Sequence, residues 1–243
     1  MKFRKRKLRL SEPLSAQIIL ISSVAMLFLI AGCQTSSSVS PLTQTISAQG
    51  PFRPAIAPGS EDAHYKLFYL ESISHLNEAT KDTPYVELPL PELIKLTKGQ
   101  AGEEEVFRSA CDAWNHEFFW KSVKSGGGSR PSRQLLEAME VSFGSYENFK
   151  AEFLNAAEYL EGNGWLWIVL ENDAIKIMTR SNYETPLAES VTPLLALDLW
   201  EHAYISKYQN NRRHYAEDFL SNLANWEFAE NNLQSVTPAK AGV

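Results

Sequence analysis

Cysteines are scarce in this sequence, and no basic stripe follows its N-terminal stretch. Two cysteines, Cys33 and Cys111, occur in the whole chain, which is too few for a disulfide framework. The stretch 1–33 holds six of the 23 basic residues and one of the 29 acidic residues, so the remaining chain has a net charge of 17 − 28 = −11. An acidic body without a basic stripe argues against nucleic acid as a partner. With 44% hydrophobic residues, the chain can build a packed core of one or two small domains.

The N-terminal stretch 1–33 has the layout of an export signal. Six basic residues within the first nine positions precede an apolar run from Ala16 to Gly32, which is short for a helix that spans a bilayer. The run leads into LIAGC at 29–33, which resembles the lipobox of bacterial lipoproteins, where the cysteine is lipidated and becomes the new N-terminus. The alternative is an uncleaved anchor helix in which Cys33 occurs by chance. In both cases the body lies outside the cytoplasm.

The resemblance to lipoproteins also predicts where the chain resides. It implies a lipid anchor on Cys33 that holds the protein to the cell envelope, facing the periplasm. Residue 34 is Gln rather than Asp, which resembles the default for sorting to the outer membrane in Gram-negative lipoproteins. The stretch 34–60 is rich in Ser, Thr, Gln and Pro without periodicity, so it is expected to form a flexible tether.

From residue 61 onward the apolar spacing predicts helices, then short strands, then helices again. The predicted helices cover 64–79, 92–123, 132–143 and 145–159, and further helix-forming sequence covers 198–233. The predicted strands, which are short and rich in Trp, Ile, Val and Leu, cover 164–170, 174–180 and 192–197. This order predicts an α+β fold with a small antiparallel sheet.

Two groups of residues could carry chemistry. His116 lies among large apolar neighbours in WNHEFFW at 114–120, so it is expected to be buried. Asp198 and His202 lie at positions i and i+4 directly after a predicted buried strand, and one helical turn would bring both side chains to one face. A hydrogen-bonded core position for His116 and a simple ion pair for the other two are the alternatives. Together with a third imidazole, these donors would suit iron, manganese or zinc.

Four stretches of the chain, in order, resemble the iron/manganese superoxide dismutases. They read WNHEFFW at 114–120, GWLW at 164–167, TPLLALDLWEHAY at 192–204 and NWEF at 225–228. The likeness extends from about residue 64 to residue 233. It implies an N-terminal helical hairpin followed by a three-stranded antiparallel sheet surrounded by helices.

The resemblance also implies one iron or manganese ion per chain, bound by three histidines and one aspartate. The matching motifs assign His116, Asp198 and His202 as three of these ligands. The first ligand of the family lies twelve positions before a Leu-Asn pair. Counting back from Leu76-Asn77 assigns that role to His64.

The division of the chain and its reaction follow from the same resemblance. The expected segments are a signal at 1–33, a tether at 34–60, an N-terminal helical hairpin domain at 61–125, a C-terminal α/β metal-binding domain at 126–233 and a tail at 234–243. The metal is expected between the two domains, where superoxide, the substrate, is converted to oxygen and hydrogen peroxide. His75 and His214 have no role in the family and are expected at the surface.

Three polar positions around the metal of that family are replaced here. In the same register, the family's gate histidine and tyrosine fall on Phe68 and Ser72, and the tyrosine that reaches the partner subunit falls on Ile205. Glu201, which bridges to the partner's last histidine in the family, is retained. The resemblance therefore leaves a homodimer open, and proton delivery through the gate is expected to be slow.

The family's glutamine beside the metal-bound solvent comes from one of two positions, which here hold Asp112 and Tyr183. Asp112 precedes His116 by one helical turn and shares its helical face. A carboxylate there would lower the potential of the metal or become a fifth ligand, and the alternative is a solvated or helix-pairing acid. Tyr183 could donate a hydrogen bond to a metal-bound hydroxide.

Two functions therefore remain open. The first is an envelope-anchored superoxide dismutase whose activity is reduced by the altered residues around the metal. The second is a metal-binding lipoprotein on the same scaffold with little or no dismutase activity. The retained ligands and the replaced gate fit both, because function resides in the site and not in the fold.

Overall fold

The computed structural model of the chain describes residues 64–128 and 130–236. These residues all belong to one compact unit, and the predicted boundary between residues 125 and 126 stays a prediction. The signal with Cys33, the tether over 34–60 and the tail from residue 237 lie outside the described residues. Among the residues described, no helix is both long and apolar enough to cross a membrane.

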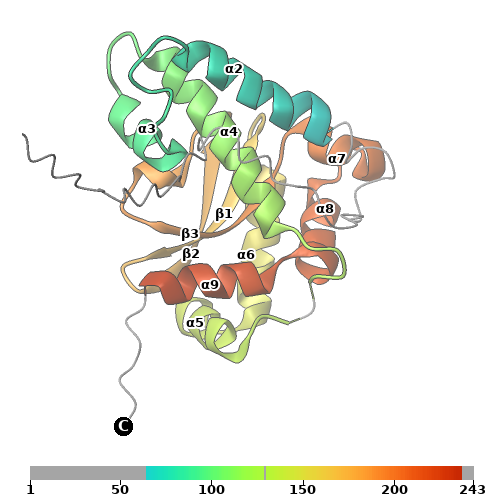
Figure 1. Ribbon diagram of the computed structural model, residues 1–243. Helices are drawn as coiled ribbons and strands as arrows, with labels where there is room; N and C mark the ends of the chain where they lie inside the picture. The colour runs from blue at the N-terminus through green and yellow to red at the C-terminus, as the bar shows by residue number, and fades with distance from the viewer. Residues whose placement is uncertain (1–63, 129, 237–243) are drawn as a thin grey trace, which may run out of the picture. The chain divides into compact units, whose positions relative to one another are not determined.

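The N-terminal part is built around two helices that pack side by side, α2 (Leu70–Thr80) and α4 (Glu104–Ser122), as Figure 1 shows. A short π-helical segment, η1 (His64–Tyr69), leads directly into α2. Helix α4 is the more deeply buried of the two, and Ala110, Ala113 and Phe119 on it are fully buried. The predicted pairing of helices in this part of the chain is confirmed.

The single helix predicted over 92–123 is wrong, because the chain forms two helices there. The first is α3 (Leu90–Thr97) and the second is α4. Between them, Gly99 and Gly102 have φ values of 69° and 88°. Glycine adopts this left-handed conformation without the steric penalty of a Cβ atom, so it ends one helix and lets the chain turn into the next.

Helices α5 (Arg133–Phe143) and α6 (Tyr146–Tyr159) agree with the prediction to within one residue at their starts. The Ser132 hydroxyl accepts a hydrogen bond from the Leu135 amide at 3.3 Å, and the Ser145 hydroxyl accepts one from the Asn148 amide at 3.1 Å. Both serines are therefore N-caps, which satisfy an amide that has no partner within the helix.

The sheet has three antiparallel strands, β1 (Gly164–Glu171), β2 (Ala174–Ser181) and β3 (Thr192–Asp198), in the order β2-β1-β3. A two-residue turn with positive φ at Asn172 and Asp173 joins β1 to β2, as the right-handed twist of a hairpin requires. Helices α4 and α9 pack against β3, and α5 and α6 pack against β2 (Figure 1). The predicted α+β fold with a three-stranded antiparallel sheet is confirmed.

The helix-forming sequence predicted over 198–233 is divided more finely than expected. It forms the helices α7 (Glu201–Tyr208), α8 (Arg212–Asp218) and α9 (Trp226–Val236), with a π-helical segment η3 (Phe219–Leu223) after α8. Asp198 is the last residue of β3 and not part of a helix. A short 3-10 turn, η2 (Pro186–Ala188), precedes β3.

Candidate metal centre

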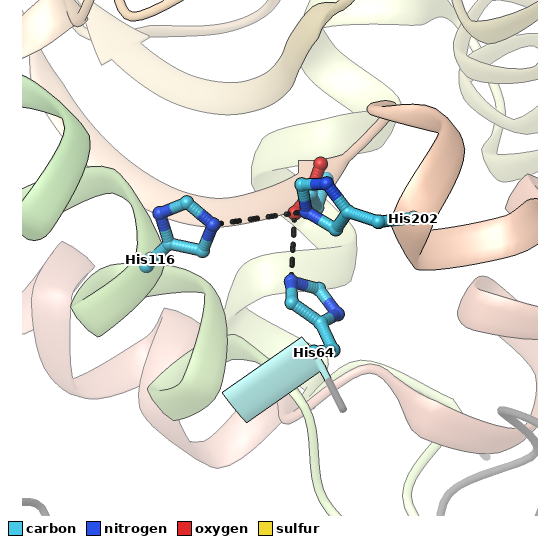
Figure 2. Close-up of side chains that lie close together, drawn as sticks. His64, His116 and His202 are labelled. Carbon is cyan, nitrogen blue, oxygen red and sulfur yellow. Dashed lines mark hydrogen bonds and ion pairs between the residues drawn. The ribbon is translucent and has the colours of Figure 1, made fainter. Parts of the chain in front are cut away.

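Four side chains from four different elements meet inside the protein. They are His64 of η1, His116 of α4, Asp198 at the end of β3 and His202 of α7, and one donor atom from each lies within 4.8 Å of the others. Figure 2 shows the three imidazoles arranged around one carboxylate oxygen. The four residues predicted as ligands are thus brought together, including His64, which the sequence assigns only by counting.

The distances within the group suit a shared ion. From Asp198 Oδ2, the Nε2 atoms of His64, His202 and His116 lie 3.0, 3.1 and 3.9 Å away. Donors that each bind one metal at about 2 Å are separated by roughly 3 to 4 Å, depending on the angle between the bonds. A first-row metal ion therefore fits between the four side chains.

Asp198 is held so that one carboxylate oxygen is available to a metal. Its Oδ1 accepts a hydrogen bond from the Trp200 amide at 2.8 Å, and its Oδ2 faces the imidazoles. Complete burial on its own would raise the pKa of this carboxyl, but the neighbouring His202 and His64 hold the pKa well below its usual range. The site therefore contains a buried negative charge.

Several imidazole nitrogens in the centre have no hydrogen-bond partner among the described residues. Nε2 of His116 and both ring nitrogens of His64 are buried without a hydrogen-bond partner. His64 Nε2 nevertheless lies 3.0 Å from the Asp198 carboxylate. Burial also lowers the pKa of His64 from 6.5 to about 4, so this ring is neutral near pH 7. Buried polar atoms normally have partners, and a metal ion would provide one for Nε2 of His64 and Nε2 of His116.

The tautomer of His116 is set by the backbone. Its Nδ1 lies 2.9 Å from the carbonyl oxygen of Asp112, one helical turn earlier. Because a carbonyl can only accept, Nδ1 carries the proton and Nε2 keeps the lone pair that a metal needs. Burial would lower the pKa of His116, but its contacts with Asp112 and the charge of Asp198 together outweigh this effect, so the pKa is raised.

Phe68 and Ser72, which are predicted at the gate, both line a pocket beside the four donors. This pocket of about 260 Å³ is also lined by His116 and His202, among other residues. The ring of Phe68 stacks on that of His202, with centroids 3.9 Å apart and planes 13° apart. The Ser72 hydroxyl of α2 donates to the carbonyl of Tyr69, the last residue of η1, at 2.7 Å, so its proton is already engaged.

The remaining candidate residues lie away from the donor atoms. The Asp112 carboxylate lies 3.4 Å from Nδ1 of His116 and is not one of the four donors that meet, so its predicted role beside the metal stays a prediction. Tyr183 accepts a hydrogen bond from the Asn115 side chain through its backbone carbonyl and does not line the pocket. Glu201 and Ile205 are exposed on α7.

Two features of the site are missing from the sequence-based prediction. Trp200 lines the pocket beside His202, and its position between two ligands in the motif could have indicated this. His75 also lines the pocket, on the same helix as Ser72, although it is predicted only as a surface residue. The sequence does not distinguish His75 from any other exposed residue, because its side chain stays exposed to solvent even beside the pocket.

Comparison with known proteins identifies similar chains. The family of iron/manganese superoxide dismutases, C-terminal domain, matches residues 131–232. A superoxide dismutase (Fe) of Synechococcus elongatus is 41% identical over 179 residues, which cover 74% of this chain and 89% of the relative.

Chains from other organisms are similar as well. A superoxide dismutase (Mn/Fe) of Rickettsia bellii is 36% identical over 182 residues, covering 75% of this chain and 87% of the relative. The chloroplastic superoxide dismutase (Fe) 1 of Arabidopsis thaliana is 36% identical over 188 residues, covering 77% of this chain and 89% of the relative. Together with the similarity to these relatives, the geometry identifies a mononuclear iron or manganese site. Its donors are His64, His116, Asp198 and His202.

Proposed function

Because this chain belongs to the iron/manganese superoxide dismutase family, we propose that it converts superoxide to oxygen and hydrogen peroxide while anchored to the cell envelope. The observation that carries the proposal is the convergence of three imidazoles and one carboxylate at a buried point beside an open pocket. A bound iron or manganese ion supplies the one-electron chemistry that oxidises one superoxide to oxygen and reduces a second one to peroxide.

The residues of the chain contribute geometry and charge. Three of the ligands are neutral imidazoles, so the single carboxylate offsets only one positive charge of a divalent or trivalent ion. The centre therefore keeps a positive charge that attracts an anion. The pocket lined by His116 and His202 provides the route for this anion, and the burial of His64 and Asp198 keeps bulk water from the other side.

Turnover is proposed to be slow because the two gate residues, Phe68 and Ser72, deliver protons poorly. Formation of peroxide takes up two protons. Phe68 has no exchangeable proton, and the Ser72 hydroxyl already donates to the Tyr69 carbonyl. Neither gate residue can therefore pass a proton from solvent into the pocket.

Anchoring in the envelope is proposed from the sequence alone. The basic residues, the apolar run and the LIAGC stretch before Gln34 support lipidation at Cys33. An acidic body behind the tether at 34–60 would act on superoxide that arises outside the cytoplasm. Superoxide is an anion and crosses membranes poorly, so an enzyme in that compartment meets a separate pool of substrate.

The test is to purify the full chain in detergent and to measure its metal content and its superoxide turnover together. We expect about one iron or manganese ion per chain and a rate below the diffusion limit of roughly 10⁸ to 10⁹ per molar per second. Asp198→Asn is the matched control, because it keeps the shape of the side chain and removes the buried charge. It should lose metal and turnover together, whereas a full metal content without turnover in the unaltered chain would favour the metal-binding alternative.

A further inference from the structure

Among the described residues, His75 is the one histidine that lines the pocket without being a metal donor. It lies on α2, one turn beyond Ser72, and its side chain is 55% exposed. The side chains of His116 and His202, which line the same pocket, are 4% and 11% exposed. One imidazole of the pocket is therefore in contact with bulk water, while the other two belong to the buried metal centre.

The other side chains of this pocket are poor sources of a proton near neutral pH. Phe68 has no exchangeable proton, and the Ser72 hydroxyl already donates to the Tyr69 carbonyl. Carboxyl groups have ordinarily lost their proton at this pH, and guanidinium and indole groups do not release theirs. An imidazole both releases and takes up a proton in this range. The other lining side chains outside the metal centre, among those described, are Glu71, Arg108, Asp112 and Trp200.

The charged groups around His75, within the described part of the chain, leave its ring able to exchange protons. Glu71, one turn earlier on α2, places a carboxylate oxygen 4.0 Å from Nε2 of His75, which is beyond hydrogen-bond distance. On the neighbouring helix α4, Arg108 pairs with Glu105, and Asp112 contacts the ligand histidine one turn after it. None of these contacts fixes a proton on the ring of His75.

We propose that His75 is the proton relay of the pocket, which takes protons from bulk water and passes them inward to superoxide as it is reduced. The inference rests on the proposed function and names a route for its protons. Reduction of one superoxide to hydrogen peroxide consumes one electron, from the bound ion, and two protons. Each proton leaves a ring nitrogen, where the electron pair of the N–H bond stays, and the exposed ring regains a proton from solvent after each transfer.

Water in the pocket would link the ring to the substrate. A single water needs roughly 10–15 Å³ of such space, so the pocket of about 260 Å³ has room for a chain of them. A relay through water is slower than a side chain that touches the substrate, so this route agrees with the slow turnover proposed above.

The test removes the imidazole and then supplies it from solution. His75→Ala abolishes the relay, and His75→Gln keeps a polar side chain that cannot carry the extra proton. His214→Ala is the matched control, because His214 is also exposed but lies on α8 against Tyr208 and does not line the pocket. Superoxide decay is followed by stopped flow for the full, metal-loaded chains, per metal ion, across pH and with or without free imidazole. Metal content and reduction potential are measured for each chain as well.

We expect both His75 variants to turn over about 10- to 100-fold more slowly, up to the low end of what a positioned acid contributes. Only the protonated ring donates, so turnover of the unaltered chain should fall as pH rises, and the variants should lose this part of the profile. Free imidazole should restore turnover in His75→Ala and leave His214→Ala unchanged. Metal content and reduction potential should match those of the unaltered chain, because His75 is not a donor.

Full turnover in His75→Gln would overturn the inference, because a hydrogen bond would then suffice where a proton donor is required. A loss that imidazole does not restore, or one that comes with a shifted potential, would also overturn it, since His75 would then support the structure and not carry protons. If the unaltered, metal-loaded chain has no turnover, this inference and the proposed function both fail. If it has turnover that both His75 variants retain, this inference alone fails.

Discussion

At the scale of single residues, two kinds of contact hold the imidazoles of the centre. His116 is oriented by the backbone carbonyl of Asp112. His64 stacks on Phe119 with centroids 5.4 Å apart, and His202 stacks on Phe68. Because aromatic faces hold two of the three rings, the nitrogen atoms of those rings stay available to a metal.

His64 is the ligand with the least support from its local sequence, and its removal tests the whole donor set. We expect His64→Ala to weaken metal binding by more than about 100-fold, the upper range for loss of a residue that only supports a ligand. The control is His75→Ala, since His75 is exposed and is not a donor. Metal content after dialysis against a chelator measures the effect, and full occupancy in His64→Ala would show that the ion is bound elsewhere.

The gate residues give a second prediction at this scale. Ser72→Tyr combined with Phe68→His should raise turnover by up to about 100-fold, because each new side chain can hand on a proton at the pocket. Ser72→Phe combined with Phe68→His is the matched control, because it supplies the same ring without the hydroxyl. Stopped-flow measurement of superoxide decay, with rates per bound metal ion, distinguishes them. If the phenylalanine variant gains as much as the tyrosine variant, the tyrosine hydroxyl contributes nothing to proton delivery.

The sequence allowed the ligands to be predicted better than their surroundings. His116, Asp198 and His202 lie in long motifs, and His64 follows from a fixed distance to Leu76-Asn77. The direction of the Asp112 carboxylate could not be predicted, because a spacing of one helical turn puts it on the ligand's face but does not say which ring nitrogen it meets. Which ring nitrogen the carboxylate meets depends on the side-chain rotamer of Asp112 and on the pocket beside it.

At the scale of elements, the centre depends on how four segments are fixed to one another. The Ser122 hydroxyl at the end of α4 accepts a hydrogen bond from the Ala196 amide of β3 at 3.0 Å. This contact holds the helix of His116 against the strand that ends at Asp198. Local capping signals such as Ser132 and Ser145 are visible in the sequence, whereas a contact between residues so far apart along the chain is not.

Arg212 at the start of α8 supports the segment that follows Asp198. Its guanidinium donates to the carbonyl oxygens of Leu160 at 2.6 Å and Leu199 at 3.1 Å, and also to that of Gly162. Arg212→Lys cannot reach all three acceptors with one ammonium group, so we expect a loss of about 1–3 kcal/mol in the free energy of unfolding.

The adjacent arginine provides the control for this prediction. Arg213 bonds the exposed side chains of Glu158 and Asn155, so Arg213→Lys should change stability by less than about 0.5 kcal/mol. Urea unfolding of the metal-free chains, followed by circular dichroism, measures both. Similar losses in the two variants would mean that the carbonyl contacts of Arg212 contribute no more than a surface pair.

At the scale of the whole molecule, the chain combines a buried metal centre with an N-terminal sequence typical of export. The described residues form the body around the metal centre, and the two cysteines of the chain fall into different settings. Cys111 is fully buried in α4, and burial raises the pKa of its thiol to about 12, so it is unreactive near neutral pH. Cys33 lies outside the described residues and is the expected site of lipidation.

The last prediction concerns this N-terminal cysteine. In cells fed a labelled fatty acid, the unaltered chain should carry the label and sediment with membranes, because acyl chains contribute about 0.8 kcal/mol for each buried CH₂ group. Cys33→Ala should carry no label, and Cys111→Ala should be labelled like the unaltered chain. A chain that sediments with membranes but is never labelled would instead support an uncleaved anchor helix over 16–32. Label that persists in Cys33→Ala would place the modification on another residue and would contradict the interpretation of LIAGC as a lipobox.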